Sequence, residues 1–182
     1  MKKSIIVICC SFAGLSMQAQ NLDSLYSVWQ DKTKPAATRA TAYYDFVWDR
    51  YLYSNPDTAE ILAKPLHTFA QTHHYSRAAA MAYNLQGVAN AMKGNYPVAL
   101  DYYKKSLAID ERNGYKKGIT GALNNIGNIY LNQGNYPQAL DYYHRSLKIY
   151  EEINDKKGIA LILNNIGNIY SLMKDYPRSL EY

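Results

Sequence analysis

Six asparagines have the side-chain chemistry and the spacing to bind the main chain of another polypeptide. They are Asn84, Asn124, Asn128, Asn132, Asn164 and Asn168. Residues four apart lie on one face of a helix. A carboxamide accepts a hydrogen bond from a backbone N–H and donates one to a backbone C=O, so a row of them binds main chain of any sequence. The alternative is a solvated helix face, although asparagine is a poor helix former there.

Side chains that usually perform catalysis or bind metals form no known motif in this sequence. The four histidines are dispersed: His67, His73, His74 and His144. Glycine-rich phosphate loops, paired-histidine metal motifs and nucleophile elbows are all absent from the sequence. We therefore expect neither enzymatic activity, nor a bound metal, nor a cofactor.

The first 20 residues have the layout of a secretory signal peptide. Lys2 and Lys3 precede a short apolar stretch from Ile5 to Leu15, and Ala19 offers a small residue for cleavage. The stretch is shorter than the roughly 20 residues that a membrane-spanning helix needs. An uncleaved anchor is the alternative. We expect an exported protein in the periplasm or cell envelope of a bacterium, cleaved after Ala19 or Gln20.

Removal of this segment changes the composition of the mature chain. Cys9 and Cys10 are the two cysteines of the sequence, so the mature chain has no disulfide and no thiolate metal site. Without Lys2 and Lys3, 18 basic residues face 15 acidic residues, a net charge of +3. This charge is too small to indicate nucleic acid or anionic lipid as a partner. With 48% hydrophobic and 19% charged residues, we expect a globular rather than a disordered chain. The mature segment is not expected to insert into a membrane.

A repeat of 40 residues dominates the remaining sequence. Residues 81–120 match residues 121–160 at 20 of 40 positions without a gap, and residues 161–182 match 121–142 at 12 of 22. The shared positions include Asn84/Asn124/Asn164, Gly87/Gly127/Gly167, Tyr96/Tyr136/Tyr176, Pro97/Pro137/Pro177, Leu100/Leu140/Leu180, Ser106/Ser146 and Gly118/Gly158. A fixed period of this length is typical of solenoid architectures.

Each unit is predicted to form two antiparallel helices. In the second unit, apolar residues recur at helical spacing between Lys117 and Gln133 and again between Pro137 and Ile153. Gly134 ends the first helix, and the short loops require neighbouring helices to run in opposite directions. Gly127 lies in mid-helix at a cost of about 1 kcal/mol relative to alanine. We therefore expect it to allow close approach of the paired helix.

These residues resemble the signature of the tetratricopeptide repeat family. In the second unit the matching positions are Leu123, Ile126, Gly127, Tyr130, Gly134, Tyr136, Ala139, Tyr143, Ser146 and Leu147. The third unit departs at Lys174, and the first departs at Gln86 and Asn90, where looser packing is expected. The resemblance, to a longer-period branch of the family, implies an all-α, right-handed superhelical solenoid of antiparallel helix pairs. It also implies that the first helix of each unit lines a concave groove, with the asparagines positioned to hold an extended peptide.

The units differ at the two ends of the chain. Residues 21–80 are predicted to be a helical cap or degenerate repeat, with helices over 22–29, 37–52 and 56–71, the last bent at Pro65. Ser54 to Asp57 form a strong helix start. Residues 161–182 contain only part of a third unit, so its apolar face is expected to meet a continuing chain or to self-associate.

The sequence thus predicts an interaction module that binds a peptide or partner protein in its groove. The alternative is the extracytoplasmic sensor region of a larger bacterial signalling protein, a histidine kinase or a nucleotide cyclase. Its catalytic part would lie beyond residue 182.

Overall fold

The computed structural model describes residues 22–182, and the expected signal peptide, residues 1–20, lies outside this range. Residues 22–30 are helical. The elements that follow are α2 (Ala36–Val47), the π-helical turn η1 (Trp48–Leu52), α3 (Pro56–Leu62), α4 (Lys64–Thr72), α5 (Ser76–Met92), α6 (Tyr96–Asn113), α7 (Lys116–Asn132), α8 (Tyr136–Glu152), α9 (Lys156–Leu172) and α10 (Tyr176–Glu181). Residues 22–182 contain no β-strand, so the predicted all-α class is confirmed.

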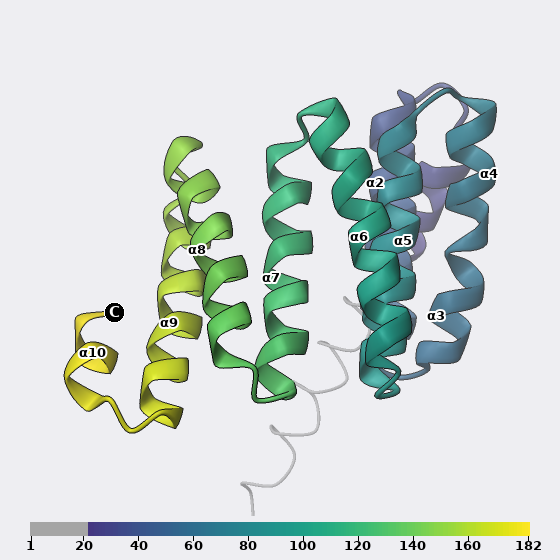
Figure 1. Cartoon of the computed structure of the whole chain (residues 1–182). Helices are drawn as coiled ribbons and strands as arrows, with labels where there is room; N and C mark the ends of the chain where they lie inside the picture. Colours follow the sequence, from purple (N-terminus) through teal and green to yellow (C-terminus); the bar gives the residue numbers. More distant parts are fainter. Residues whose placement is uncertain (1–21) are drawn as a thin grey trace, which may run out of the picture.

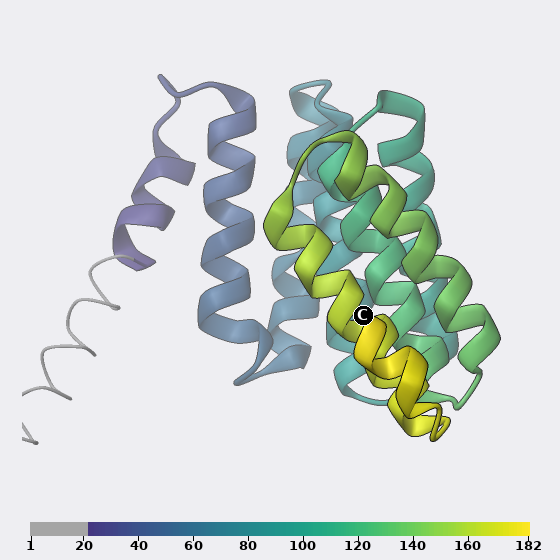
Figure 2. The same ribbon diagram turned by 90° about the vertical axis from the view of Figure 1, so that its left-hand side faces the viewer.

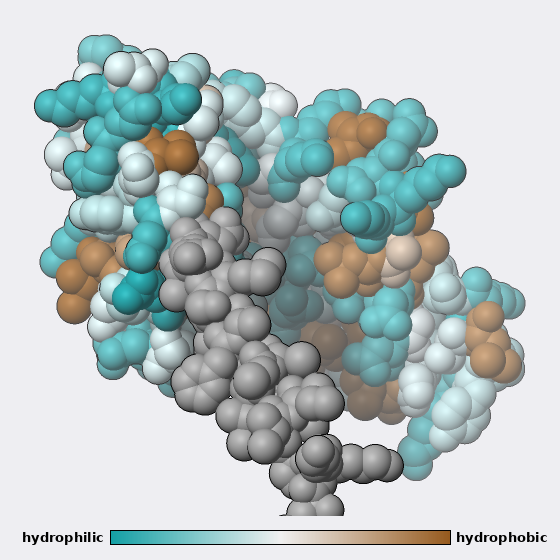
Figure 3. All heavy atoms as spheres, turned by 180° about the vertical axis from the view of Figure 1, so that it is seen from behind, coloured by the Kyte–Doolittle hydropathy of each residue, from teal (hydrophilic) through white to brown (hydrophobic). Residues whose placement is uncertain are grey.

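The helices from α5 onward stand in a row in chain order, each antiparallel to the one before it (Figure 1). The turned view shows α8 and α9 in front of the earlier pairs, as successive layers of a solenoid (Figure 2). From behind, the surface is hollowed between the N-terminal helices and those around α9 (Figure 3). The chain therefore forms a curved helical solenoid with one hollow face.

The forty-residue period of the sequence is also the period of the structure. Helices α5, α7 and α9 begin at Ser76, Lys116 and Lys156, and α6, α8 and α10 begin at Tyr96, Tyr136 and Tyr176. Each connection between consecutive helices from α4 to α10 contains one residue of positive φ. These residues are His74, Gly94, Gly114, Gly134, Asn154 and Lys174. Lys174 reaches the same backbone conformation, at φ 60°, that Gly134 adopts at φ 72°, so the turn survives the loss of the glycine.

A tyrosine ring of the paired helix lies against the mid-helix glycine. A Cβ added to Gly127 would come within 2.6 Å of Cε1 of Tyr143, and one added to Gly87 within 2.5 Å of Cε1 of Tyr103. The expected close approach at Gly127 is therefore present, and its reason is an aromatic ring. A second contact also repeats: Ser146 donates a hydrogen bond to the backbone O of Thr120 at 3.2 Å, as Ser106 does to Ala80 at 2.9 Å.

Residues 22–72 pack onto α5 as a cap. Tyr43, Val47 and Leu66 share one buried cluster with Met81 and Leu85 of α5. The sequence predicts one bent helix from Pro56, whereas the structure has two, α3 and α4, that meet at Ala63. The reason is Pro65, which has no backbone N–H to donate and fits only the first turn of a new helix.

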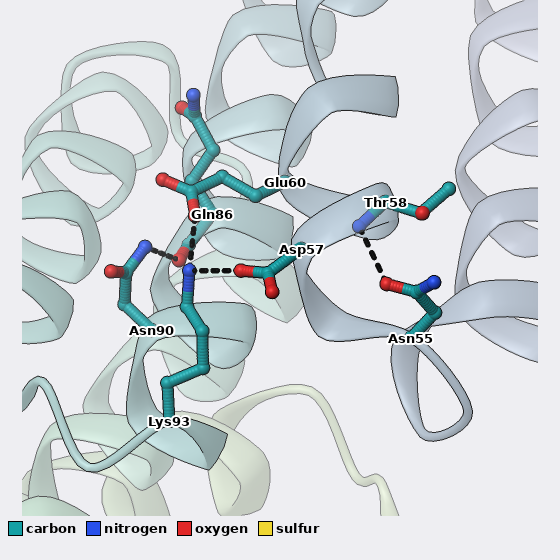
Figure 4. Close-up of polar contacts among 7 residues, drawn as sticks. All are labelled: Asn55, Asp57, Thr58, Glu60, Gln86, Asn90 and Lys93. Carbon is teal, nitrogen blue, oxygen red and sulfur yellow. Dashed lines mark hydrogen bonds and ion pairs between the residues drawn. The ribbon is translucent and has the colours of Figure 1, made fainter.

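Polar contacts fasten the cap to the end of α5 (Figure 4). Asn55 caps α3 by accepting a hydrogen bond from the backbone N of Thr58 at 3.0 Å. Lys93 Nζ lies 2.6 Å from Glu60 Oε2 and 2.9 Å from Asp57 Oδ1, and these two carboxylates raise the pKa of Lys93. The cap is therefore held by charge as well as by apolar contact.

The two departures of the first unit from the repeat pattern are hydrogen bonded. Asn90 is only 4% exposed, and its Nδ2 donates to the backbone O of Gln86 at 2.8 Å (Figure 4). The Gln86 side chain bonds the His67 ring at 3.0 Å. Where the sequence suggests looser packing, the polar side chains thus find partners in α5 itself and in α4.

Candidate binding groove

A cavity of about 330 Å³ lies on the inner side of the solenoid. Its wall includes residues from α2, η1, α5, α6, α7, α8 and α9. Trp48, Met81, Tyr150 and Leu161 supply the apolar part of the wall. A space shared by so many layers forms only when the repeats stack, because no single helix pair contains it.

Two of the predicted asparagines line this cavity and are held by neighbouring layers. Asn84 Oδ1 accepts a hydrogen bond from the hydroxyl of Tyr44 in α2 at 2.8 Å. Asn124 Oδ1 accepts one from Nδ2 of Asn165 in α9 at 2.9 Å. Within residues 22–182, no hydrogen bond uses the amide nitrogen of Asn84 or Asn124. Both side chains are therefore oriented, and their N–H groups remain available to a ligand.

The other four predicted residues lie elsewhere. Asn164 and Asn168 line a separate cavity of about 490 Å³ between α9 and α10. Asn128 Oδ1 accepts from the hydroxyl of Tyr143 at 2.6 Å, and burial raises the pKa of Tyr143 to about 12, which keeps this hydroxyl a neutral donor. Asn132 is exposed at the last residue of α7. Of the six predicted residues, two thus line the first cavity and two line the second.

Sequence reasoning missed Asn125 and Asn165, which directly follow the predicted Asn124 and Asn164. Asn125 lines the cavity, and Asn165 forms the bond to Asn124. Their signal is the asparagine doublet that recurs at 124–125 and 164–165. In the first doublet both residues line this cavity, and in the second Asn165 reaches across to Asn124.

The cavity wall also contains an ion pair that the repeat pattern does not predict. Arg77 Nη1 lies 2.5 Å from Asp110 Oδ1, and the side chains are 24% and 1% exposed. Burial raises the pKa of Asp110, and Arg77 opposes this shift. Gly118 leaves room for the pair, since a Cβ there would overlap atoms of both side chains.

Residues 22–182 contain no group of three or more histidine, cysteine, aspartate or glutamate side chains placed to hold a metal ion. No helix among these residues combines the length and the apolar character needed to cross a bilayer.

The sequence matches two family models, both described as tetratricopeptide repeat. One model covers residues 66–114 and the other covers residues 119–182. Among curated proteins, no significant sequence match was found. Together the two matches cover most of the repeat, residues 81–182, and extend back to residue 66.

Solved structures of similar fold come from several organisms. BtubC (BKLC) from P. vanneervenii has 18% sequence identity and a TM-score of 0.67 over 90% of this chain and 67% of that one. Aspartyl phosphate phosphatase F from Bacillus subtilis has 17% identity and a TM-score of 0.75, over 94% of this chain and 47% of that one. A signal transduction ATPase with a tetratricopeptide repeat sensor, from Pyrococcus horikoshii, has 22% identity and a TM-score of 0.66. It is matched over 84% of this chain and 24% of its own length, so the chain spans about a quarter of it.

Proposed function

This chain belongs to the tetratricopeptide repeat family, and we propose that it binds an extended segment of another protein along the groove. The observation that carries the proposal is the pair of oriented carboxamides, Asn84 and Asn124, on one cavity wall. Repeat proteins of this family serve protein–protein interaction, and each free amide N–H is a donor for a backbone carbonyl. The apolar residues Met81 and Leu161 beside them accommodate side chains of the segment.

We propose further that the chain acts by binding rather than by catalysis. The cavity wall carries carboxamides, aromatic rings, one ion pair, Lys117 and Ser106. The Ser106 hydroxyl donates to a backbone carbonyl, so these groups suit the holding of a peptide rather than its cleavage. The apolar stretch after Lys2 and Lys3 supports export, so that the binding would take place in the bacterial envelope.

Replacing two asparagines tests the groove. Asn124→Ala combined with Asn164→Ala removes a carboxamide from each cavity, so we expect at least tenfold weaker binding of a groove ligand, about 1.4 kcal/mol. The free energy of unfolding should stay within about 1 kcal/mol of the parent. The probe is a peptide selected on residues 22–182 from a displayed library of random 12-residue peptides, with affinity measured by calorimetry.

The matched control is Asn132→Ala. Asn132 belongs to the same predicted row but lines neither cavity, so its loss should leave the affinity unchanged within twofold. Equal affinity of the double variant and the parent would remove the groove assignment, and so would a library that yields no binder.

A sensor region of a larger signalling protein is the second candidate function. The observation that favours it is the similarity to the Pyrococcus horikoshii ATPase, whose repeats are described as a sensor. The test is the gene beyond residue 182: an apolar span of about 20 residues followed by a catalytic domain would support this role. A reading frame that closes after one further helix would exclude it.

A further inference from the structure

We propose that Asn113 is a site of spontaneous deamidation, and that this modification loosens the junction between α6 and α7. The inference goes beyond peptide binding and does not depend on it. It is carried by a single Asn–Gly pair, by the exposed position of that pair in the fold, and by the hydrogen bonds that the reaction removes.

The residue that follows Asn113 distinguishes it from every other asparagine of the sequence. Asn113 precedes Gly114, whereas each other asparagine precedes a residue with a side chain. Glycine has no Cβ, so its backbone nitrogen approaches the preceding carboxamide without steric hindrance. One repeat earlier and one repeat later, the equivalent residues are His73 and Ile153. The reaction is therefore confined to one connection of the solenoid.

The reaction needs no reagent other than water. The backbone nitrogen of Gly114 attacks Cγ of Asn113, a C–N bond forms, and the Cγ–Nδ2 bond breaks. Ammonia leaves and takes with it the proton of the attacking amide. Water then opens the cyclic imide at either carbonyl, which gives aspartate, or isoaspartate with the main chain running through the side-chain carbon. Asparagine is a thermolabile residue for this reason.

The structure leaves this pair accessible at the end of a helix. Asn113 is the last residue of α6, and both Asn113 and Gly114 are exposed. A Cβ placed on Gly114 would have no atom within 4 Å, so water and base reach its backbone nitrogen. That nitrogen donates to the backbone O of Glu111 at 3.2 Å, and this bond opens whenever the last turn of the helix frays.

Deamidation removes contacts that end α6. Nδ2 of Asn113 donates to the backbone O of Ile109 at 2.7 Å, and an ionised carboxylate in its place has no hydrogen to donate. The new negative charge also lies at a helix C-terminus, where the macrodipole disfavours it. Isoaspartate adds a carbon to the main chain, and so displaces the Tyr115 N–H from the backbone O of Asp110, which it meets at 2.9 Å.

The affected connection borders the 330 Å³ cavity. Asp110 precedes the connection, Lys117 and Gly118 follow it, and all three line the cavity. A looser connection therefore changes how α6 and α7 face each other across the cavity wall. Ageing of the protein at Asn113 thus reaches the groove without a change in any groove residue.

The test is incubation of the purified, folded chain at mildly alkaline pH, followed by trypsin digestion and mass spectrometry. Trypsin cuts after Arg112 and Lys116, so residues 113–116 form a peptide of their own. We expect this peptide to gain the mass of an amide-to-acid change about tenfold or more faster than peptides with other asparagines, where the next residue is bulkier. A sample digested without incubation corrects for conversion during digestion.

Two outcomes would overturn the assignment of the site. One is faster conversion at any other asparagine. The other is conversion of Asn113 in the urea-unfolded chain but not in the folded chain, because the end of α6 would then protect it.

Asn113→Gln is the matched control, because glutamine keeps the amide but needs a larger ring to react. Its peptide should not gain mass, and incubation should leave its melting temperature unchanged. Asn113→Asp carries the product from the start and should melt about 2–4 °C below the parent, as for loss of one hydrogen bond. The incubated parent should approach this lower value. Equal melting temperatures of Asn113→Asp, the incubated parent and the fresh parent would refute the loosening of the junction.

Discussion

Gly127→Leu is expected to lower the free energy of unfolding by about 3 kcal/mol or more, through overpacking in a filled core. Even the first added carbon would lie 2.6 Å from the Tyr143 ring. Tyr143 is fully buried, and its hydroxyl is bonded to Asn128, so the ring cannot yield without opening the α7–α8 pair. Urea unfolding followed by circular dichroism measures the loss.

Gly121 provides the matched control for this prediction. It lies in the same helix, yet a Cβ there would have no atom within 4 Å. Gly121→Ala should therefore stabilise the chain by about 1 kcal/mol through helix propensity, whereas Gly127→Ala should destabilise it. If the two alanine variants shifted stability in the same direction, contact with Tyr143 would not be the reason for the glycine.

Arg77→Ala is expected to lower the free energy of unfolding by about 3–5 kcal/mol at neutral pH, because it leaves the buried Asp110 carboxylate unpaired. Asp110 is 1% exposed, and Arg77 is its partner within residues 22–182. The double variant Arg77→Gln/Asp110→Asn should recover most of the loss, because no buried charge remains. Equal losses in the single and double variants would show that side-chain packing dominates rather than charge.

The pH dependence of the Arg77→Ala loss identifies its cause. Burial raises the pKa of Asp110 in the folded chain, and removal of Arg77 raises it further. A folded-state pKa above the unfolded value means that the folded chain binds the extra proton, so stability falls as pH rises through this range. The loss relative to the parent should be full at neutral pH. It should shrink as the pH falls through the raised pKa of Asp110, because the carboxyl is then protonated in the folded variant and in the folded parent alike. A loss that is constant across this range would exclude the charge explanation.

The repeat architecture could be predicted from the sequence because the same physical requirement recurs. Gly127, the turn at Gly134 and the tyrosines each reappear after forty residues, so the comparison of units reveals which choices serve packing. The helix bounds then follow to within a residue or two, since the apolar spacing and the turn residues mark both ends of each helix.

Features that occur once could not be predicted in this way. The pairing of Arg77 with Asp110 joins two helices at one junction, and neither residue recurs in the next unit. The carboxamide row was predicted from its spacing, whereas the partner of each carboxamide oxygen, such as the Tyr143 hydroxyl on Asn128, depends on packing between helices. Which predicted asparagines contact a ligand, and where the units divide between residues 80 and 161, stay predictions.

The stacking of layers has a mechanical consequence. Each helix of the solenoid packs mainly against the helices before and after it in the chain, so the array resists twisting and stretching only through a series of local contacts. A ligand in the cavity would touch α2, α5, α7 and α9 at once. It would thereby connect helices that are not consecutive in the chain. Occupation would therefore make the array stiffer and its melting more concerted, without the formation of any new contact within the chain.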